Sequence, residues 1–293
     1  MDVVTANGLE FGYLAEGPAD GPLALCLHGF PDSAHTWRHL LPELAAAGFR
    51  AVAPFLRGYA PTEVPADGAY RTGVLGADLN ALHEALGGGP DAVLVGHDWG
   101  AAAVYAALAQ EPARWRRAVT MALPPLPAMF AGFLSYEQLK RSFYIFLFQT
   151  PLAEAVLDRT FVAGLWRDWS PGHDAAEDVE RAMACLATPA NVAAALGYYR
   201  AMLDPSRDRS VPDAAEASAG PGERPILYLH GTDDGCLGPE ITGGPEGVLP
   251  HLPPGSRAEL VDGAGHFLHL ERPDAVNARV LGWLAGDEGG AED

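Results

Sequence analysis

The chain has 293 residues, of which 48% are hydrophobic and 19% are charged, so it can form one large core with a smaller inserted module. Its formal net charge of −19 argues against nucleic acids and anionic membranes as partners. No uninterrupted apolar stretch is long enough to span a bilayer, and residues 1–10 lack the basic start and apolar run of a signal peptide.

The first part of the chain predicts strands that alternate with helices. A hairpin is expected over residues 3–5 and 9–15, because Asn7-Gly8 favours a tight turn. Short apolar runs predict buried strands at 23–27, 49–53, 92–95 and 118–123. Helical patterns cover 37–47, 70–86 and 101–108. Strands that alternate with helices indicate a mostly parallel sheet with helices on both faces.

The alternation stops at Pro124-Pro125-Leu126-Pro127, and only helical patterns follow, up to about Leu203. A polar loop at 205–225 returns the chain to strands at 226–230 and 258–261, a closing helix at 273–285 and an acidic tail at 286–293. We therefore predict an α/β core formed by residues 1–123 and 225–293. Residues 124–224 are predicted to form a helical cap with its return loop.

The sequence around Asp98 predicts a nucleophile. Gly96-His97-Asp98-Trp99-Gly100 joins the apolar strand before it to a helix of small residues, and glycines on both sides permit a sharp turn. A carboxylate is already ionised at neutral pH, and the helix N-terminus is expected to hold it further toward the anion. Such a group suits attack on a saturated carbon, which forms an ester that water later hydrolyses. The alternative is that Asp98 only caps the helix.

Two later strands are followed by partners for such a nucleophile. Asp234 follows the strand at 226–230, and His266 follows the strand at 258–261 in a glycine-containing loop. An acid and then a histidine, in this chain order after the nucleophile, are typical of a catalytic triad in this kind of sheet. His266 is the candidate base and Asp234 the acid that orients it. Asp233 remains an alternative acid and His269 an alternative base.

An earlier turn supplies hydrogen-bond donors. His28-Gly29-Phe30-Pro31 follows the strand at 23–27, so the backbone N–H of Phe30 can form an oxyanion hole together with that of Trp99. The alternative, an ordinary turn before a helix, presents the same amide.

These motifs together resemble an epoxide hydrolase of the α/β-hydrolase superfamily over nearly the whole chain. The resemblance implies two cap tyrosines that bind the epoxide oxygen. Residues 141–149 (RSFYIFLFQ) are similar to the family segment that carries the first, which assigns Tyr144. Tyr198-Tyr199-Arg200 is similar to the second segment, which assigns Tyr199. Tyr136 and Tyr198 remain alternatives. Phe55 and Ala60 stand where the family often has Asp and Gly, outside the expected chemistry.

The expected activity is hydrolysis of an epoxide to a vicinal diol. Phe30, Trp99, Phe143 and Phe148 are expected to form an apolar pocket between core and cap, which favours a small lipophilic substrate. A haloalkane dehalogenase is the nearest alternative, because it uses the same triad with a tryptophan beside the nucleophile. The side chain of Phe30 cannot donate a hydrogen bond to a halide, and this disfavours the dehalogenase. A non-catalytic ligand-binding protein of the same fold is a further alternative.

No cofactor or metal ion is expected. Phosphate-binding and dinucleotide-binding motifs are missing from the sequence. His35 and His39 are four residues apart but have no third ligand, so we interpret them as a solvated face. Cys26, Cys185 and Cys236, an odd number and widely separated, favour a reducing cytoplasm without disulfides.

Overall fold

The structure is a computed structural model that describes residues 1–204 and 223–286. These residues form an eight-stranded sheet with the order β1-β2-β4-β3-β5-β6-β7-β8. The strands are β1 (Asp2–Ala6), β2 (Leu9–Glu16), β3 (Leu23–Leu27), β4 (Arg50–Pro54), β5 (Val93–His97), β6 (Arg117–Met121), β7 (Ile226–Gly231) and β8 (Arg257–Val261). β2 pairs antiparallel with β1 and β4, and every other pair is parallel. The predicted α/β class is confirmed.

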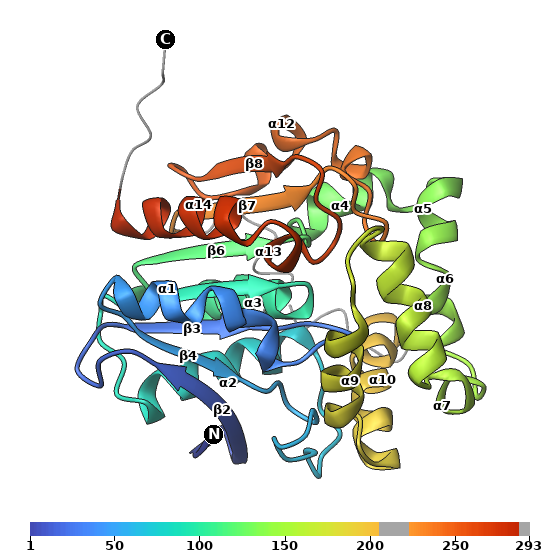
Figure 1. The fold of residues 1–293 in the computed structure, drawn as a ribbon, viewed down its shortest axis with the longest axis horizontal. Helices are drawn as coiled ribbons and strands as arrows, with labels where there is room; N and C mark the ends of the chain where they lie inside the picture. Colours follow the sequence, from blue (N-terminus) through green and yellow to red (C-terminus); the bar gives the residue numbers. More distant parts are fainter. Residues whose placement is uncertain (205–222, 287–293) are drawn as a thin grey trace.

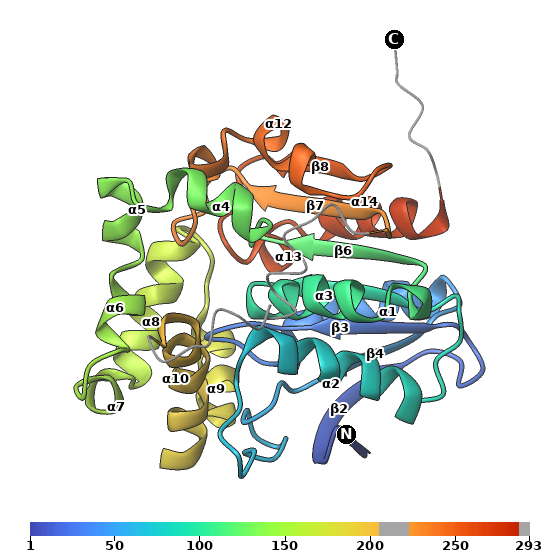
Figure 2. The same cartoon turned by 180° about the vertical axis from the view of Figure 1, so that it is seen from behind.

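Helices cover both faces of the sheet. Helices α1 (Leu41–Ala46) and α14 (Pro273–Ala285) lie on one face, and α2 (Thr72–Ala85) and α3 (Trp99–Gln110) lie on the other (Figures 1 and 2). The single helix expected at 37–47 is two elements, a 3₁₀ turn η1 (Ala34–His39) followed by α1. Pro42 lies in the first turn of α1 and has no N–H to donate to the preceding turn, which explains the break.

The part of the chain between β6 and β7 that the structure describes is helical. Its helices are α4 (Leu126–Phe133), α5 (Tyr136–Arg141), α6 (Phe143–Leu147), α7 (Ala153–Val156), α8 (Arg159–Trp169), α9 (Ala176–Cys185) and α10 (Pro189–Leu203). We call α4–α10 the cap. It lies at the end of the sheet toward which β6 and β7 point (Figure 1). Most of the predicted return loop, residues 205–222, and the tail 287–293 lie outside the described residues, and 124–224 remains our proposed extent of the cap.

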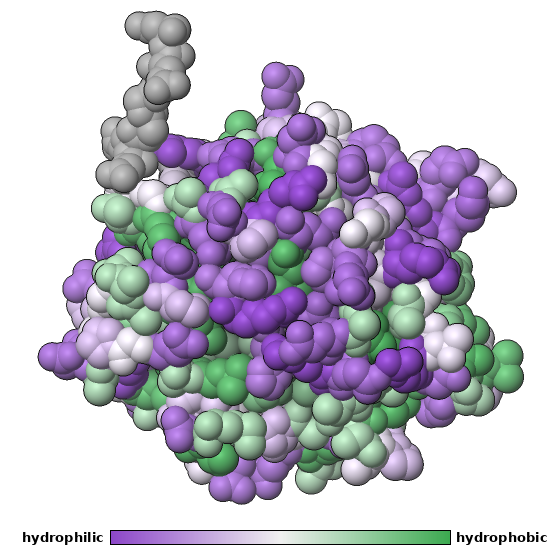
Figure 3. All heavy atoms as spheres, in the orientation of Figure 1, coloured by the Kyte–Doolittle hydropathy of each residue, from purple (hydrophilic) through white to green (hydrophobic). Residues whose placement is uncertain are grey.

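Short elements complete the described chain: η2 (Pro112–Arg114), η3 (Pro239–Thr242), α12 (Pro245–Val248), η4 (Leu249–His251) and α13 (Leu268–Glu271). Several large apolar side chains of the cap are exposed, namely Phe130, Leu134, Tyr136, Phe143, Phe146 and Leu152. In the view of Figure 3, apolar residues also reach the surface at the edge formed by the cap. Among the described helices, none combines the length and apolar character needed to cross a membrane.

A buried ion pair holds together four segments of the molecule. The Arg57 guanidinium donates two hydrogen bonds of 2.6 Å to the Asp78 carboxylate, and both side chains are buried. Asn7 donates a third bond to Asp78 from the β1–β2 turn. The carbonyl oxygen of Arg57 accepts a bond of 2.8 Å from the hydroxyl of Tyr198 on α10, so this pair also supports the contact between core and cap.

Replacing Asp78 tests this ion pair. Asp78→Asn leaves the buried Arg57 without its counter-charge, and we expect the free energy of unfolding to fall by about 3–5 kcal/mol in urea denaturation. Glu137→Gln is the control, because Glu137 pairs with Lys140 at 3.4 Å on the surface. An exposed pair contributes at most about 1 kcal/mol. Equal, small losses in the two variants would contradict a structural role for the buried pair.

Candidate active site

Asp98 lies at the turn between β5 and α3, and its backbone has the uncommon dihedral angles φ 51° and ψ −121°. The glycines on either side permit this turn. A Cβ at Gly96 would lie 2.5 Å from the carbonyl oxygen of Gly100, and a Cβ at Gly100 would lie 2.1 Å from that of Leu27. Larger residues would therefore force β3, β5 and α3 apart.

The Asp98 carboxylate faces the turn that follows β3. Its Oδ1 accepts a hydrogen bond of 2.8 Å from the backbone N–H of Phe30, and the N–H of Trp99 donates to the same carboxylate. A Cβ at Gly29 would lie 2.3 Å from Asp98 Oδ1, so glycine is needed for this approach. The side chain makes no hydrogen bond of the helix-capping type. The two amides expected to form an oxyanion hole thus both contact Asp98.

The sequence-based expectation that Asp98 is held further toward the anion is wrong in direction. Burial raises the pKa of Asp98 above its ordinary value. The charge of His266 and the hydrogen bonds from Phe30 and Trp99 lower it, but they offset only part of this effect. The physical reason is that desolvation of a buried carboxylate outweighs the local amide dipoles. The pKa of Asp98 is therefore sensitive to the charge of His266 but is set mainly by burial.

His266 lies between the two carboxylates that chain order suggested. Its Nδ1 is 3.0 Å from Asp234 Oδ2, and its Nε2 is 3.8 Å from Asp98 Oδ2. Asp234 is buried, and its Oδ1 accepts bonds of 2.7 and 2.9 Å from the backbone N–H groups of Cys236 and Leu237. These contacts fix the carboxylate and leave Oδ2 for the imidazole. His266 Nε2 has no hydrogen-bond partner among the described residues.

The alternatives Asp233 and His269 lie elsewhere. The Asp233 side chain is exposed and accepts a bond of 3.2 Å from Thr232 Oγ1. His269 is buried, stacks on Trp37 with ring centroids 4.7 Å apart, and contacts Thr36 Oγ1 at 2.6 Å. The geometry thus favours Asp234 and His266 over both alternatives.

Charge explains how His266 and Asp234 affect one another. Burial alone would lower the pKa of His266, but the charge and hydrogen bond of Asp234, with the charge of Asp98, raise it above its ordinary value. Burial alone would raise the pKa of Asp234, but His266 and a hydrogen bond from His230 hold it well below its ordinary value. The arrangement favours an imidazolium between two carboxylates.

Sequence reasoning missed His230. Its Nε2 lies 3.3 Å from Asp234 Oδ2 and 2.7 Å from the carbonyl oxygen of Leu237, and its Nδ1 hydrogen-bonds the hydroxyl of Tyr228. Its place at the carboxyl end of β7, four residues before Asp234, was a signal in the sequence that could have found it.

The two assigned tyrosines lie in a cluster of rings next to Asp98. Tyr144 and Tyr199 are buried, with ring centroids 5.6 Å apart, and the centroid of Phe30 lies 6.4 Å from Tyr144 and 5.3 Å from Tyr199. Phe148 contacts all three rings at 5.2–5.6 Å, and Trp99 contacts Tyr199 at 5.3 Å. Burial, and then neighbouring groups that include Asp98, raise the pKa of both tyrosines.

The hydroxyl groups of this cluster have few partners. That of Tyr199 has only the donor Trp99 beside it and no acceptor among the described residues, and that of Tyr144 lies 3.5 Å from the thiol of Cys236. Tyr198 instead donates to Arg57, and Tyr136 is 76% exposed. The geometry therefore favours Tyr144 and Tyr199 over the two alternatives.

Two aromatic residues depart from expectation. Phe143 was expected to line the pocket, but it is 48% exposed and its ring contacts Tyr144 and Phe161. The start of α6 turns it toward the surface, one position before the buried Tyr144. Trp169 was missed: its ring lies 5.1 Å from both Tyr144 and His266. It stands at the C-terminal end of an amphipathic helix, where the sequence pattern predicts only a core position.

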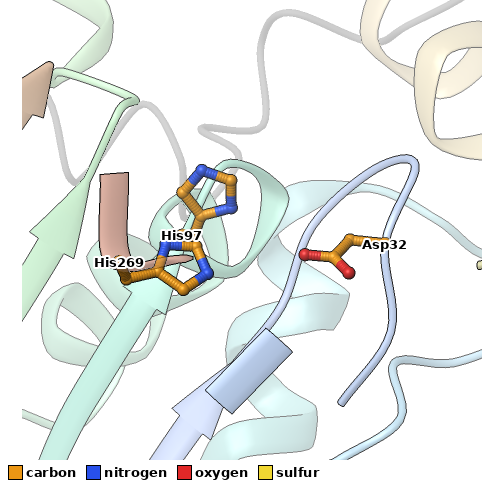
Figure 4. Close-up of side chains that lie close together, drawn as sticks. All are labelled: Asp32, His97 and His269. Atoms are coloured by element: carbon orange, nitrogen blue, oxygen red, sulfur yellow. The ribbon is translucent and has the colours of Figure 1, made fainter. Parts of the chain in front are cut away.

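Among the described residues, one buried group could hold a cation. It consists of Asp32, His97 and His269, whose ligand atoms lie within 4.8 Å of one another (Figure 4). Sequence reasoning did not single out this group, because its members come from three separate segments.

The comparisons with known proteins identify the family of the chain. Residues 22–273 match the family model of the α/β hydrolase fold, and the chain belongs to this family. Epoxide hydrolase A of Mycobacterium tuberculosis is 31% identical, in an alignment that covers 98% of this chain and 97% of that protein. The crystal structure of epoxide hydrolase A from Mycobacterium thermoresistibile has a TM-score of 0.79 at 28% identity, covering 97% of this chain and 98% of that one. Within the α/β hydrolases, the chain is a member of the epoxide hydrolases.

A haloalkane dehalogenase loop variant from Bradyrhizobium elkanii has a TM-score of 0.80 at 24% identity, covering 97% of this chain and 96% of that one. At this identity the likeness shows a shared fold alone.

Exchanging the two neighbouring acids tests the position of the orienting carboxylate. Asp234→Asn removes the charge that supports the His266 imidazolium, and we expect the steady-state rate to fall by about 10²–10⁴-fold. Asp233→Asn, the matched control on an exposed side chain, should change the rate by less than about twofold. The reverse ranking would mean that Asp233 is the functional acid.

Proposed function

We propose that the protein hydrolyses a small lipophilic epoxide to a vicinal diol through a covalent ester on Asp98. The observation that carries this proposal is the buried Asp98 carboxylate, which accepts a hydrogen bond from the N–H of Phe30 and lies 3.8 Å from His266 Nε2. Two buried tyrosines lie close enough for the charge of Asp98 to raise their pKa. The surrounding rings suit an apolar substrate, and the tyrosine hydroxyls provide the polar groups that fix its orientation.

The first half-reaction is ring opening. An Asp98 carboxylate oxygen attacks a ring carbon, the carbon–oxygen bond breaks, and its electron pair remains on the ring oxygen. That oxygen takes a proton from Tyr144 or Tyr199, which donate because both phenols are neutral at pH 7. The Tyr199 hydroxyl supports this role, because no described residue accepts its proton and an epoxide oxygen would do so.

The second half-reaction is hydrolysis of the ester. His266 takes a proton from water through Nε2, and the resulting hydroxide attacks the carbonyl carbon of the Asp98 ester. Asp234 holds the ring through Nδ1 and stabilises the imidazolium that forms. The N–H groups of Phe30 and Trp99, which already contact the carboxylate, stabilise the negative oxygen of the tetrahedral intermediate. Its collapse breaks the bond between the carbonyl carbon and the alkyl oxygen, which takes the proton of the His266 imidazolium as the diol leaves. The carboxylic acid that remains gives its proton to His266, which restores the Asp98 carboxylate.

Two observations weigh against the alternatives. A dehalogenase needs donors for a leaving halide, whereas the side chain of Phe30 has none and the tyrosine pair suits an oxygen. A non-catalytic binding protein has no need of a positive φ at Asp98 or of a buried imidazole nitrogen without a partner, both of which cost stability. We also propose a reducing compartment, the cytoplasm, because all three cysteines are free.

Phenylalanine substitutions test the tyrosines. Tyr144→Phe and Tyr199→Phe remove one proton donor each, and we expect each to slow ring opening by about 10²–10⁴-fold in stopped-flow measurements. The double variant should be nearly inactive but folded. Tyr136→Phe, on the exposed alternative, is the control and should retain the wild-type rate. Wild-type rates in both single variants would refute the assignment.

The covalent step is tested by stalling the second half-reaction. His266→Gln keeps the nucleophile and the tyrosines but removes the base, so the variant should open one epoxide and remain alkylated. Intact mass spectrometry with excess styrene oxide should show one adduct of the full epoxide mass, located by peptide mapping to Asp98.

Three other outcomes of this experiment have distinct meanings. If a haloalkane leaves an alkyl adduct and releases halide in a single burst, while epoxides do not label the protein, the result favours a dehalogenase. If wild type turns over epoxides but the variant never accumulates an adduct, the covalent mechanism is wrong. Absence of turnover and of labelling with both substrate classes favours the binding protein.

A further inference from the structure

Three buried polar side chains converge directly behind the loop that carries His266. Asp32 lies in the turn after β3, His97 ends β5, and His269 lies on α13. All three are at most 2% exposed. Figure 4 shows the carboxylate of Asp32 directed toward the two imidazole rings. Asp32 Oδ2, His97 Nδ1 and His269 Nδ1 each lack a hydrogen-bond partner among the described residues.

The opposite nitrogen of each ring has a partner, and for His97 this partner fixes the tautomer. His97 Nε2 lies 2.9 Å from the carbonyl oxygen of His266, which only accepts, so His97 carries its proton on Nε2 and a lone pair on Nδ1. His269 Nε2 lies 2.6 Å from Thr36 Oγ1, a hydroxyl that can donate to it or accept from it. Burial lowers the pKa of His97 well below its ordinary value and that of His269 to about 3, so both rings are neutral.

We propose that Asp32, His97 and His269 bind one ordered internal water molecule. The water accepts a hydrogen bond from His269 Nδ1–H and donates one to His97 Nδ1 and one to Asp32 Oδ2. In this network the single hydroxyl proton of Thr36, which also lies near Asp32, is donated to His269 Nε2. Each group then has a partner, as buried polar groups require, and three protein partners are usual for a buried water.

The geometry of the group fits a water molecule, and its protonation favours water over a metal ion. The ligand atoms lie within 4.8 Å of one another, which hydrogen bonds of about 2.8 Å to a central water allow. Burial also raises the pKa of Asp32 to about 7, and water can donate to the carboxylate or accept from the carboxylic acid, whereas a cation requires the carboxylate.

The network has a consequence for the second half-reaction, and this step depends on the proposed function. The bond from His97 Nε2–H to the carbonyl of His266 connects the water site to the main chain of the proposed base. Asp32, His97 and His269 are therefore positioning residues for His266. Because ring opening does not use His266 as a base, loss of the network should affect ester hydrolysis selectively.

The water site is tested first without any measurement of activity. A crystal structure at about 1.2 Å of the full chain should show a peak about 2.8 Å from each of the three atoms, and elemental analysis should find no stoichiometric metal. ¹⁵N NMR of labelled protein should report the Nε2–H tautomer for His97 and the Nδ1–H tautomer for His269. A stoichiometric metal ion, or direct contact among the three side chains without density between them, would overturn the proposal.

Kinetics of single-site variants test the positioning role. His269→Phe keeps a flat ring against Trp37 but removes the polar atoms, and we expect ester hydrolysis to slow by about tenfold or more, with ring opening unchanged within about twofold. His269→Gln retains a donor and should restore most of the rate. His83→Phe is the matched control, since His83 is a buried histidine on α2 that packs against Trp115.

Equal slowing of both half-reactions in His269→Phe would mean a structural role only and would overturn the positioning claim. A wild-type protein that opens no epoxide would refute the proposed function, while the crystal and NMR measurements would still decide the water site.

Discussion

The structure depends on one backbone constraint, the positive φ of Asp98 at the turn between β5 and α3. A side chain in this conformation costs about 1–3 kcal/mol and persists only where its surroundings enforce it. Here the close approach of Gly96 to Gly100, and of Gly100 to the carbonyl of Leu27, ties the turn to two neighbouring strands. The strained turn projects the carboxylate beyond the sheet edge, where the amide of Phe30 reaches it. The sheet therefore fixes both the nucleophile and its donors.

The cap contributes more than a cover for the site. The carbonyl oxygen of Trp169, at the end of α8, accepts hydrogen bonds from the backbone N–H groups of His266 at 2.9 Å and Gly235 at 3.1 Å. The next residue, Ser170, accepts one of 3.0 Å from the N–H of Phe267 through its hydroxyl. One turn of the cap thus holds the loops of both the proposed base and its acid, while the Trp169 ring contacts Tyr144. Displacement of α8 would disturb the tyrosines and His266 together.

Much of this arrangement could be predicted because it follows from local chain chemistry. Gly-x-Asp-x-Gly between an apolar strand and a helix predicts the turn at Asp98, and residues that follow parallel strands meet at one sheet edge, as Asp234 and His266 do. The rest depends on packing between distant segments. Phe143 and Tyr144 are neighbours in a helix, and only the contacts of the cap decide which is buried. From the sequence alone, Trp169 and His97 look like ordinary core residues, because their partners lie far away in the chain. Burial also raises the pKa of Asp98, whereas the helix N-terminus, which is visible in the sequence, was expected to lower it.

The charges of the site suit a reaction in two steps. In the free enzyme, Asp234 and Asp98 raise the pKa of His266, and the imidazolium in turn lowers that of Asp98. In the proposed mechanism, ester formation neutralises Asp98 and removes one of the charges that raise the pKa of His266. The pKa of His266 then falls, which promotes the neutral form that the second step needs, and the proton that the ring loses can restore the tyrosine that protonated the ring oxygen. Burial, which raises the pKa of Tyr144 and Tyr199, drives this return because it disfavours a tyrosinate. The first half-reaction thereby generates the base required by the second.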